Sequence, residues 1–102
     1  GGLNATPSKV KIEDGKATLI SVVGGAEKTF DLGLKDGKLS FQSFSLGSVV
    51  REGNQLKLEI AVENALLKRM PLDHFANSEA GVILKAIADQ NLDLKIKATG
   101  TK

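Results

Sequence analysis

The dipeptide Asp36-Gly37 constrains the fold of this chain more than any other feature, because it stands between two segments of alternating apolar residues. A two-residue type I′ turn needs positive φ at both central positions, and Asp followed by Gly supplies them at low cost. The resulting hairpin would place Leu34 opposite Leu39 and Leu32 opposite Phe41, with all four side chains on one face. This part of the chain therefore predicts a central antiparallel hairpin.

Alternation of apolar and polar residues predicts further strands in segments 9–13, 55–62 and 92–100, and a high content of β-branched residues predicts one in segment 17–23. Asp14-Gly15 is a turn signal between the first two segments. Segment 17–23 carries apolar residues on both of its sides. We therefore expect this strand to be buried on both faces.

The apolar residues that follow the central hairpin pose a problem of parity. After the Asp36-Gly37 turn the core candidates Leu39 and Phe41 are odd-numbered, and those from Phe44 onward are even-numbered. A three-residue loop over 52–54 would give a second hairpin in which Val50 pairs with Leu56 and belongs to the even, core-facing set. One long strand shared by both hairpins must then change parity, through a one-residue bulge at 42–43 or by crossing from one sheet to another.

A helix is predicted over residues 79–90. Its apolar residues recur at the i, i+3, i+4, i+7 spacing of one buried stripe: Ala80, Ile83, Leu84 and Ile87. Asn77 or Ser78 can cap the start of this helix, and Asn91 suits the left-handed residue after its end. The preceding segment 64–71 can form one or two helical turns that its proline ends.

A chain of 102 residues has room for one domain with one modest core. We predict an α+β fold, mostly antiparallel β, with about six strands in hairpins and the helix near 79–90 packed on the sheet. Residues 1–8 are expected to form a flexible N-terminal arm, and residues 9–102 a single β-rich domain. No apolar run approaches the ~18 residues that a transmembrane helix needs.

Composition and motifs argue against several functional classes. The fourteen Lys and Arg residues are interspersed with twelve Asp and Glu residues, and Tyr and Trp are absent, which disfavours binding of nucleic acid or sugar. The chain has no Cys and only one His, His74, so a zinc site is not expected. No Ser lies in a G-x-S-x-G motif, and no phosphate-binding loop is present. The sequence therefore predicts a protein that is not an enzyme and has no cofactor or metal.

Apolar residues supply the remaining candidate site, which lies between the predicted helix and the sheet. Its members are Leu66, Leu67, Met70, Leu72 and Phe75 before the helix, and Leu32, Phe41 and Phe44 on the sheet. The first hypothesis is that lipid or another apolar ligand enters between segment 66–76 and this sheet face, where Met adapts to irregular surfaces. On this hypothesis Leu67→Asp leaves the domain folded but impairs binding, whereas Leu84→Asp unfolds it.

Two alternatives to a ligand site remain open. The same apolar residues would also fill an ordinary core. The chain would then be a protein–protein interaction or structural assembly module without a small-molecule ligand, docking through a sheet edge or a loop.

The phrases LKDGKLSF at 34–41 and LDLKIKATG at 92–100 resemble the strands of AsmA-type bacterial envelope proteins. That resemblance implies a β-rich fold, a periplasmic, cell-surface or secreted location, and a role in lipid transport and outer-membrane assembly. The phrase LEIAVEN at 58–64 is similar to the late-embryogenesis WHy domain, although the Asn-Pro-Asn of that family is absent. Neither resemblance implies a catalytic residue.

Overall fold

The computed structural model describes residues 2–5, 7–23 and 25–101, and for residues 2–5, 23 and 101 it describes the backbone alone. It confirms an α+β fold that is mostly antiparallel β, with one main helix. The elements are β1 (Gly2–Ala5), β2 (Lys9–Glu13), β3 (Lys16–Val23), β4 (Ala26–Lys35), β5 (Lys38–Phe41), β6 (Phe44–Glu52), β7 (Gln55–Val62), α1 (Asn64–Arg69), the 3-10 helix η1 (Leu72–Phe75), α2 (Glu79–Asp89) and β8 (Asp93–Thr101). The described strands number eight, compared with the six or so expected.

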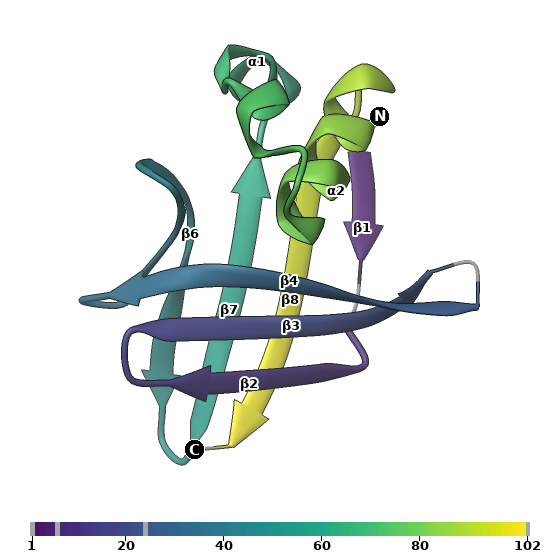
Figure 1. Ribbon diagram of the computed structural model, residues 1–102. Coiled ribbons are helices and arrows are strands. Elements are labelled where there is room, and N and C mark those ends of the chain that lie inside the picture. Colours follow the sequence, from purple (N-terminus) through teal and green to yellow (C-terminus); the bar gives the residue numbers. More distant parts are fainter. Residues whose placement is uncertain (1, 6, 24, 102) are drawn as a thin grey trace.

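The strands form one sheet in the order β1-β8-β7-β6-β5-β4-β3-β2, so that every neighbouring pair except β1–β8 is also consecutive in the chain. Figure 1 shows β2, β3 and β4 crossing in front of β7 and β8, while the helices gather at one end of these crossed layers. Buried side chains from both layers meet in one core, among them Leu19 and Phe30 from the first layer and Leu58 and Ile60 from the second. The sheet therefore folds back on itself around its own apolar face.

The central hairpin forms with the predicted turn. Asp36 has φ 51° and Gly37 has φ 77°, as a type I′ turn requires, and Leu34 lies opposite Leu39. The ladder ends one pair short of the expected Leu32–Phe41 pair, although both of these side chains are buried in the core.

The chain turns at Gln42-Ser43, where the sequence predicted a bulge or a crossing within one long strand. Phe41 pairs with Phe44 across this turn, and the prediction of a single strand was wrong. Gln42 adopts φ 56°, a conformation that a non-glycine residue seldom shows, so the sequence carried no turn signal here. A bulge does occur, but in β6, where Leu46 has no partner in the ladder and is buried in the core.

The connection between β6 and β7 is also one residue shorter than predicted. Its loop is Gly53-Asn54, and Val50 pairs with Lys57 rather than with Leu56. Gly53 has φ 60°, which suits the first central position of a two-residue type II′ turn. The shift of one residue turns Val49 toward the core and leaves Val50 54 % exposed.

Strand β3 is buried on one face only, in contrast to the prediction. Ala17 and Leu19 are buried, whereas Ile20 is half-buried and Val22 is 63 % exposed. The helices do not cover the outer face of β3, and the apolar residues there border solvent.

The helix α2 agrees closely with its prediction. The Ser78 hydroxyl accepts a hydrogen bond from the Gly81 amide at 3.0 Å, and Asn91 follows the helix with φ 58°. Ala80, Leu84 and Ile87 of the predicted stripe are buried, and Ile83 is half-buried. The remaining buried residues are Gly81 and Ala88.

Asn64 fastens α1 to the neighbouring elements. Its backbone amide donates to Asp93 Oδ1 at 2.7 Å, and its Nδ2 donates to the carbonyls of Leu92 at 2.9 Å and Ala88 at 3.3 Å. These bonds join the start of α1 to the end of α2 and the start of β8. The two α-helices and η1 therefore form one layer that covers one end of the sheet, hereafter the helix-covered end (Figure 1).

Gly2–Ala5, from the arm expected at residues 1–8, form β1 and pair in parallel with β8 from Asp93 to Ile96. Beyond Ile96, β8 is paired only with β7 among the described strands. The sheet thus has β1 at one edge and β2 at the other.

Candidate binding surface

The structure brings the eight predicted site residues together at the helix-covered end. Five of them are buried in the core: Leu32, Phe41, Leu67, Met70 and Leu72. The other three are half-buried and pack against that core: Phe44, Leu66 and Phe75. The rings of Phe41 and Phe75 stack edge to face, with centroids 5.3 Å apart and planes at 86°. This cluster joins the helix layer to the sheet, and its role in binding stays a prediction.

Leu67 shows how firmly the segment before α2 is packed. Its side chain is fully buried, with 0 % of its surface exposed. The hypothesis that Leu67→Asp leaves the fold intact is therefore not supported by this position, because the substitution would bury an unpaired charge.

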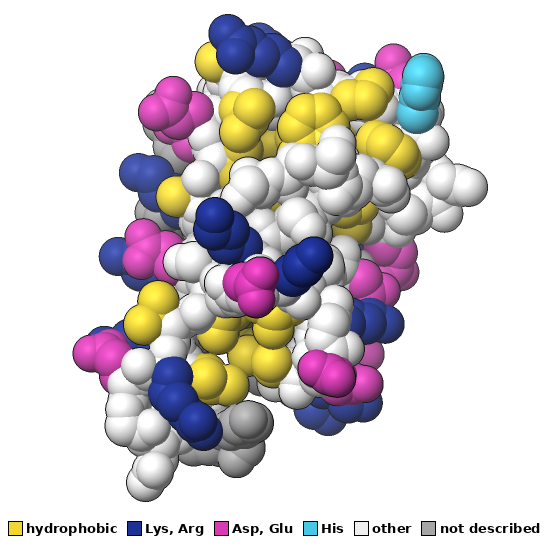
Figure 2. All heavy atoms as spheres, turned by 90° about the vertical axis from the view of Figure 1, so that its left-hand side faces the viewer, with side chains coloured by type: hydrophobic (Ala, Val, Ile, Leu, Met, Phe, Trp, Pro, Cys, Tyr) yellow, Lys and Arg dark blue, Asp and Glu magenta, His cyan; other side chains and the backbone are white. Residues whose placement is uncertain are grey.

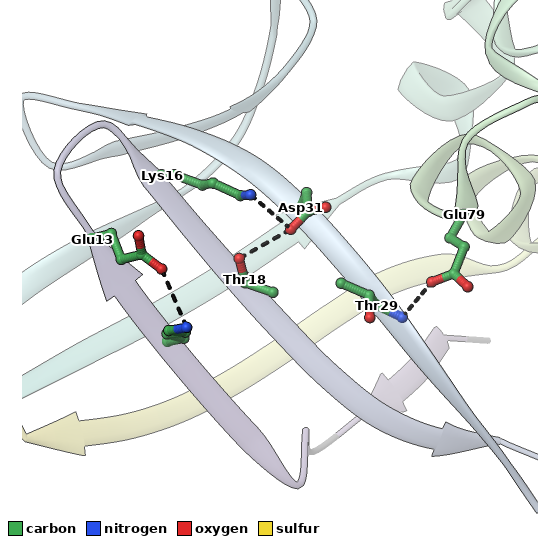
Figure 3. A network of polar contacts seen from close by, with 7 residues as sticks. Glu13, Lys16, Thr18, Thr29, Asp31 and Glu79 are labelled. Atoms are coloured by element: carbon green, nitrogen blue, oxygen red, sulfur yellow. Dashed lines mark hydrogen bonds and ion pairs between the residues drawn. The ribbon is translucent and has the colours of Figure 1, made fainter.

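A polar groove of about 670 Å³ runs between β4, the end of β5 and the start of α2. Glu79 Oε2 accepts a hydrogen bond from the Thr29 amide at 2.7 Å, so that α2 satisfies a donor on the edge of β4. Asp31, on the outer face of β4, accepts from Thr18 Oγ1 at 3.0 Å and pairs with Lys16 at 3.7 Å. Figure 3 shows both interactions. Lys16, Asp31 and Glu79 of this groove therefore already have partners within the chain.

An apolar hollow of about 570 Å³ lies on another side of the molecule, between the turns of two hairpins. We call it the turn-side hollow. Its apolar lining consists of half-buried Ile12, Leu34, Val49 and Leu56. Its charged lining has both signs: Glu13, Asp14, Asp36 and Arg51. Figure 2 shows the corresponding side of the molecule, where a patch of hydrophobic side chains is framed by basic and acidic ones.

Backbone hydrogen bonds hold the walls of the turn-side hollow in place. The Leu34 amide donates to the Gly15 carbonyl at 3.0 Å, which ties the β2–β3 turn to β4. The Val49 amide donates to the Gly37 carbonyl at 2.8 Å, which ties the β4–β5 turn to β6. The hollow is therefore formed before any partner arrives, and a partner need not order its walls.

Strand β2 leads directly into this hollow and forms an edge of the sheet. Its outward side chains, Lys9, Lys11 and Glu13, are exposed, and its inward ones, Val10 and Ile12, are half-buried. An edge strand presents unpaired backbone groups to which an extended polypeptide can add. The edge and the hollow together form a candidate surface for an extended polypeptide.

This surface does not follow from the sequence, although part of its signal is present there. The alternation in segment 9–13 was recognised, but its position at an edge depends on which strands pair across the whole sheet. The inward place of Val49 depends on the length of the β6–β7 loop, which was predicted one residue too long.

Comparison of the chain with family models, curated proteins and solved structures finds no match. The resemblance to AsmA-type proteins and to the WHy domain therefore stays a prediction.

Among the described residues, no group of three or more His, Asp or Glu side chains could hold a metal ion. His74 is exposed in η1. Within the same residues, every helix is too short or too polar to cross a membrane.

Proposed function

We propose that this chain is a non-enzymatic binding module that takes an extended segment of a polypeptide along the edge of β2. The observation that carries the proposal is the junction of a free edge strand with the turn-side hollow at Ile12. Backbone hydrogen bonds to β2 would supply affinity, and the hollow would select an apolar side chain at one position of the segment.

The packing of the helix-covered end favours this function over the ligand site first expected there. An apolar ligand between the helices and the sheet would have to displace buried Leu32, Phe41 and Leu67. A segment added to β2 displaces no core side chain. It would instead cover Val10 and Ile12, which the sheet leaves half-exposed.

Short peptides selected from a random display library provide the test. Backbone amide signals of isotope-labelled protein should shift at Lys9–Glu13 when a selected peptide binds. Ile12→Lys should abolish these shifts, because an inward-pointing charge on an edge strand opposes pairing. Val22→Lys, on the exposed face of β3, is the matched control and should leave binding unchanged.

The proposal fails if selected peptides shift amides elsewhere and leave β2 unperturbed, or if the selection yields no binder. Circular dichroism must show that Ile12→Lys remains folded. If it does not, Ile12→Thr provides a milder loss of apolar contact in the same hollow.

A further inference from the structure

The charges of β2 are complementary to those of a second β2 running antiparallel to it. The sequence of the strand is Lys-Val-Lys-Ile-Glu. Lys11 and Glu13 precede and follow Ile12 in the chain, and both are exposed on the outer face, whereas Ile12 points inward. A two-fold axis through Ile12 would place Lys11 of each copy opposite Glu13 of the other. Opposite charges that face each other across antiparallel strands stabilise their pairing.

The same arrangement brings two apolar surfaces together. Ile12 would lie opposite Ile12 of the second copy, and each Ile12 lines its own turn-side hollow with Leu34, Val49 and Leu56. The two hollows would then open toward each other across the axis. Side chains that a single copy leaves half-exposed would lose contact with water.

Within one copy, Lys11 and Glu13 are held only weakly. They form an ion pair of 3.6 Å, with 64 % and 56 % of their side chains exposed (Figure 3). An exposed pair of this kind contributes little to stability, so both side chains can exchange it for a partner across the axis at small cost.

We propose that the segment bound along β2 is β2 of a second copy of this chain, in an antiparallel register centred on Ile12, giving a symmetric dimer with a continuous sheet. This inference rests on the proposed function and names its partner. A symmetric contact of this kind closes after two copies and does not propagate. The interface is small, since it consists of one short strand pair and two hollows, so the dimer should be weak.

Sedimentation equilibrium, carried into the millimolar range at low salt, measures the dimer directly. Glu13→Lys and Lys11→Glu should each weaken self-association about tenfold or more, because the symmetry makes every reversed charge count twice. An equimolar mixture of the two variants should recover the dimer, since each lysine then faces a glutamate of the other variant.

Lys9→Glu is the matched control. It reverses a charge on the same outward face of the same strand, but the register centred on Ile12 places Lys9 opposite Gly15 of the second copy. Its self-association should equal that of the unsubstituted protein. Circular dichroism and thermal unfolding of each variant separate a lost interface from a lost fold.

The proposed dimer is wrong if the protein is monomeric at every concentration. It is also wrong if neither charge reversal weakens self-association. A mixture that stays monomeric would also overturn this register. The broader proposed function, binding of an extended polypeptide along β2, still holds after any of these results if selected peptides shift the amide signals of Lys9–Glu13. Conversely, a dimer that forms while all such peptides bind elsewhere would separate self-association from the general binding role.

Discussion

The helix-covered end and the turn-side hollow are built from the same strands, yet only one of them is closed. On β4, Phe30 and Leu32 are 6 % and 2 % exposed beneath the covering elements. Two residues further along the same face, Leu34 is half-buried and lines the hollow. The difference lies in the covering layer, since α2 packs against β4 and Leu32 lies beside Ala80 of that helix. Of the described residues, none from a helix lines the hollow at Leu34. Alternation along a strand therefore decides which way a side chain faces, and the neighbouring layer decides how deeply it is buried.

The largest effect should come from placing a charge beneath the helix layer. We expect Leu67→Asp to cost more than about 4 kcal/mol, because Leu67 is fully buried and an aspartate there would have no partner. Val82→Asp is the control, since Val82 on α2 is 53 % exposed and should tolerate the same charge. Urea denaturation followed by circular dichroism measures both. Equal stabilities would show that segment 66–76 can move aside, and would restore the ligand site first predicted there.

Close packing within the helix layer predicts the next effect. A Cβ atom on Gly81 would lie 2.0 Å from the carbonyl oxygen of Phe75, which is backbone and cannot swing away. Gly81→Ala should therefore cost about 1–3 kcal/mol despite the better helix propensity of alanine. Gly100→Ala is the matched substitution in an open position of β8, where nothing lies within 4 Å of the added atom. A stable Gly81→Ala variant would mean that η1 can shift relative to α2.

Truncation of one leucine in the helix-covered end and of one in the turn-side hollow compares the two regions directly. Leu84→Ala should cost about 3 kcal/mol, since it leaves a cavity beneath α2 that cannot collapse fully. Leu34→Ala should cost only about 1 kcal/mol, because its side chain is half-buried and water can fill the space. Thermal unfolding of the two variants under identical conditions gives the comparison. Similar costs would indicate that the hollow is already covered in solution, as it would be within a dimer.

The smallest effect concerns the charges on the surface of the helix layer. Lys85 lies 3.3 Å from Asp73 of η1 and 3.3 Å from Asp89 of α2. Hydrogen bonds to Asp73 and then to Asp89 raise the pKa of Lys85 above its ordinary 10.5. A raised pKa stabilises the fold fully below the unfolded value, and this contribution is lost as the pH rises through the folded value. Lys85→Gln should therefore lower the unfolding temperature slightly at neutral pH, but not at a pH above the pKa of Lys85 in the folded protein. If the variant and the unsubstituted protein differ by the same amount at both pH values, this linkage is wrong.

The sequence identified features that depend on neighbouring residues. The type I′ turn at Asp36-Gly37, the cap at Ser78 and the left-handed Asn91 follow from local chemistry, and each was confirmed. The turn at Gln42-Ser43 could not be found in this way, because Gln42 occupies a left-handed conformation that its type disfavours. Phe41 and Phe44 pair across this turn, and that pairing does not follow from the types of the turn residues themselves.

The candidate surface was harder to predict than the fold for a related reason. The inward positions of Ile12 and Leu34 follow from alternation, but their partial exposure depends on where the helices end. Val49 also required the correct loop length, since a shift of one residue exchanges it with Val50. Leu67 was predicted to lie in the segment past which a ligand enters, although α1 turns it into the core.

The strand order has a consequence for the speed and sequence of folding. From β2 to β7 each strand pairs with the next one in the chain across a short turn, so these ladders can form by successive closure of short loops. The β7–β8 ladder must wait for a longer closure, because α1, η1 and α2 lie between these two strands. The parallel pairing of β1 with β8 is different, because it joins the two ends of the chain and cannot begin until β8 is in place. We therefore expect β1 to dock last during folding and to separate first during unfolding, with its amide hydrogens exchanging with solvent faster than those of the hairpins.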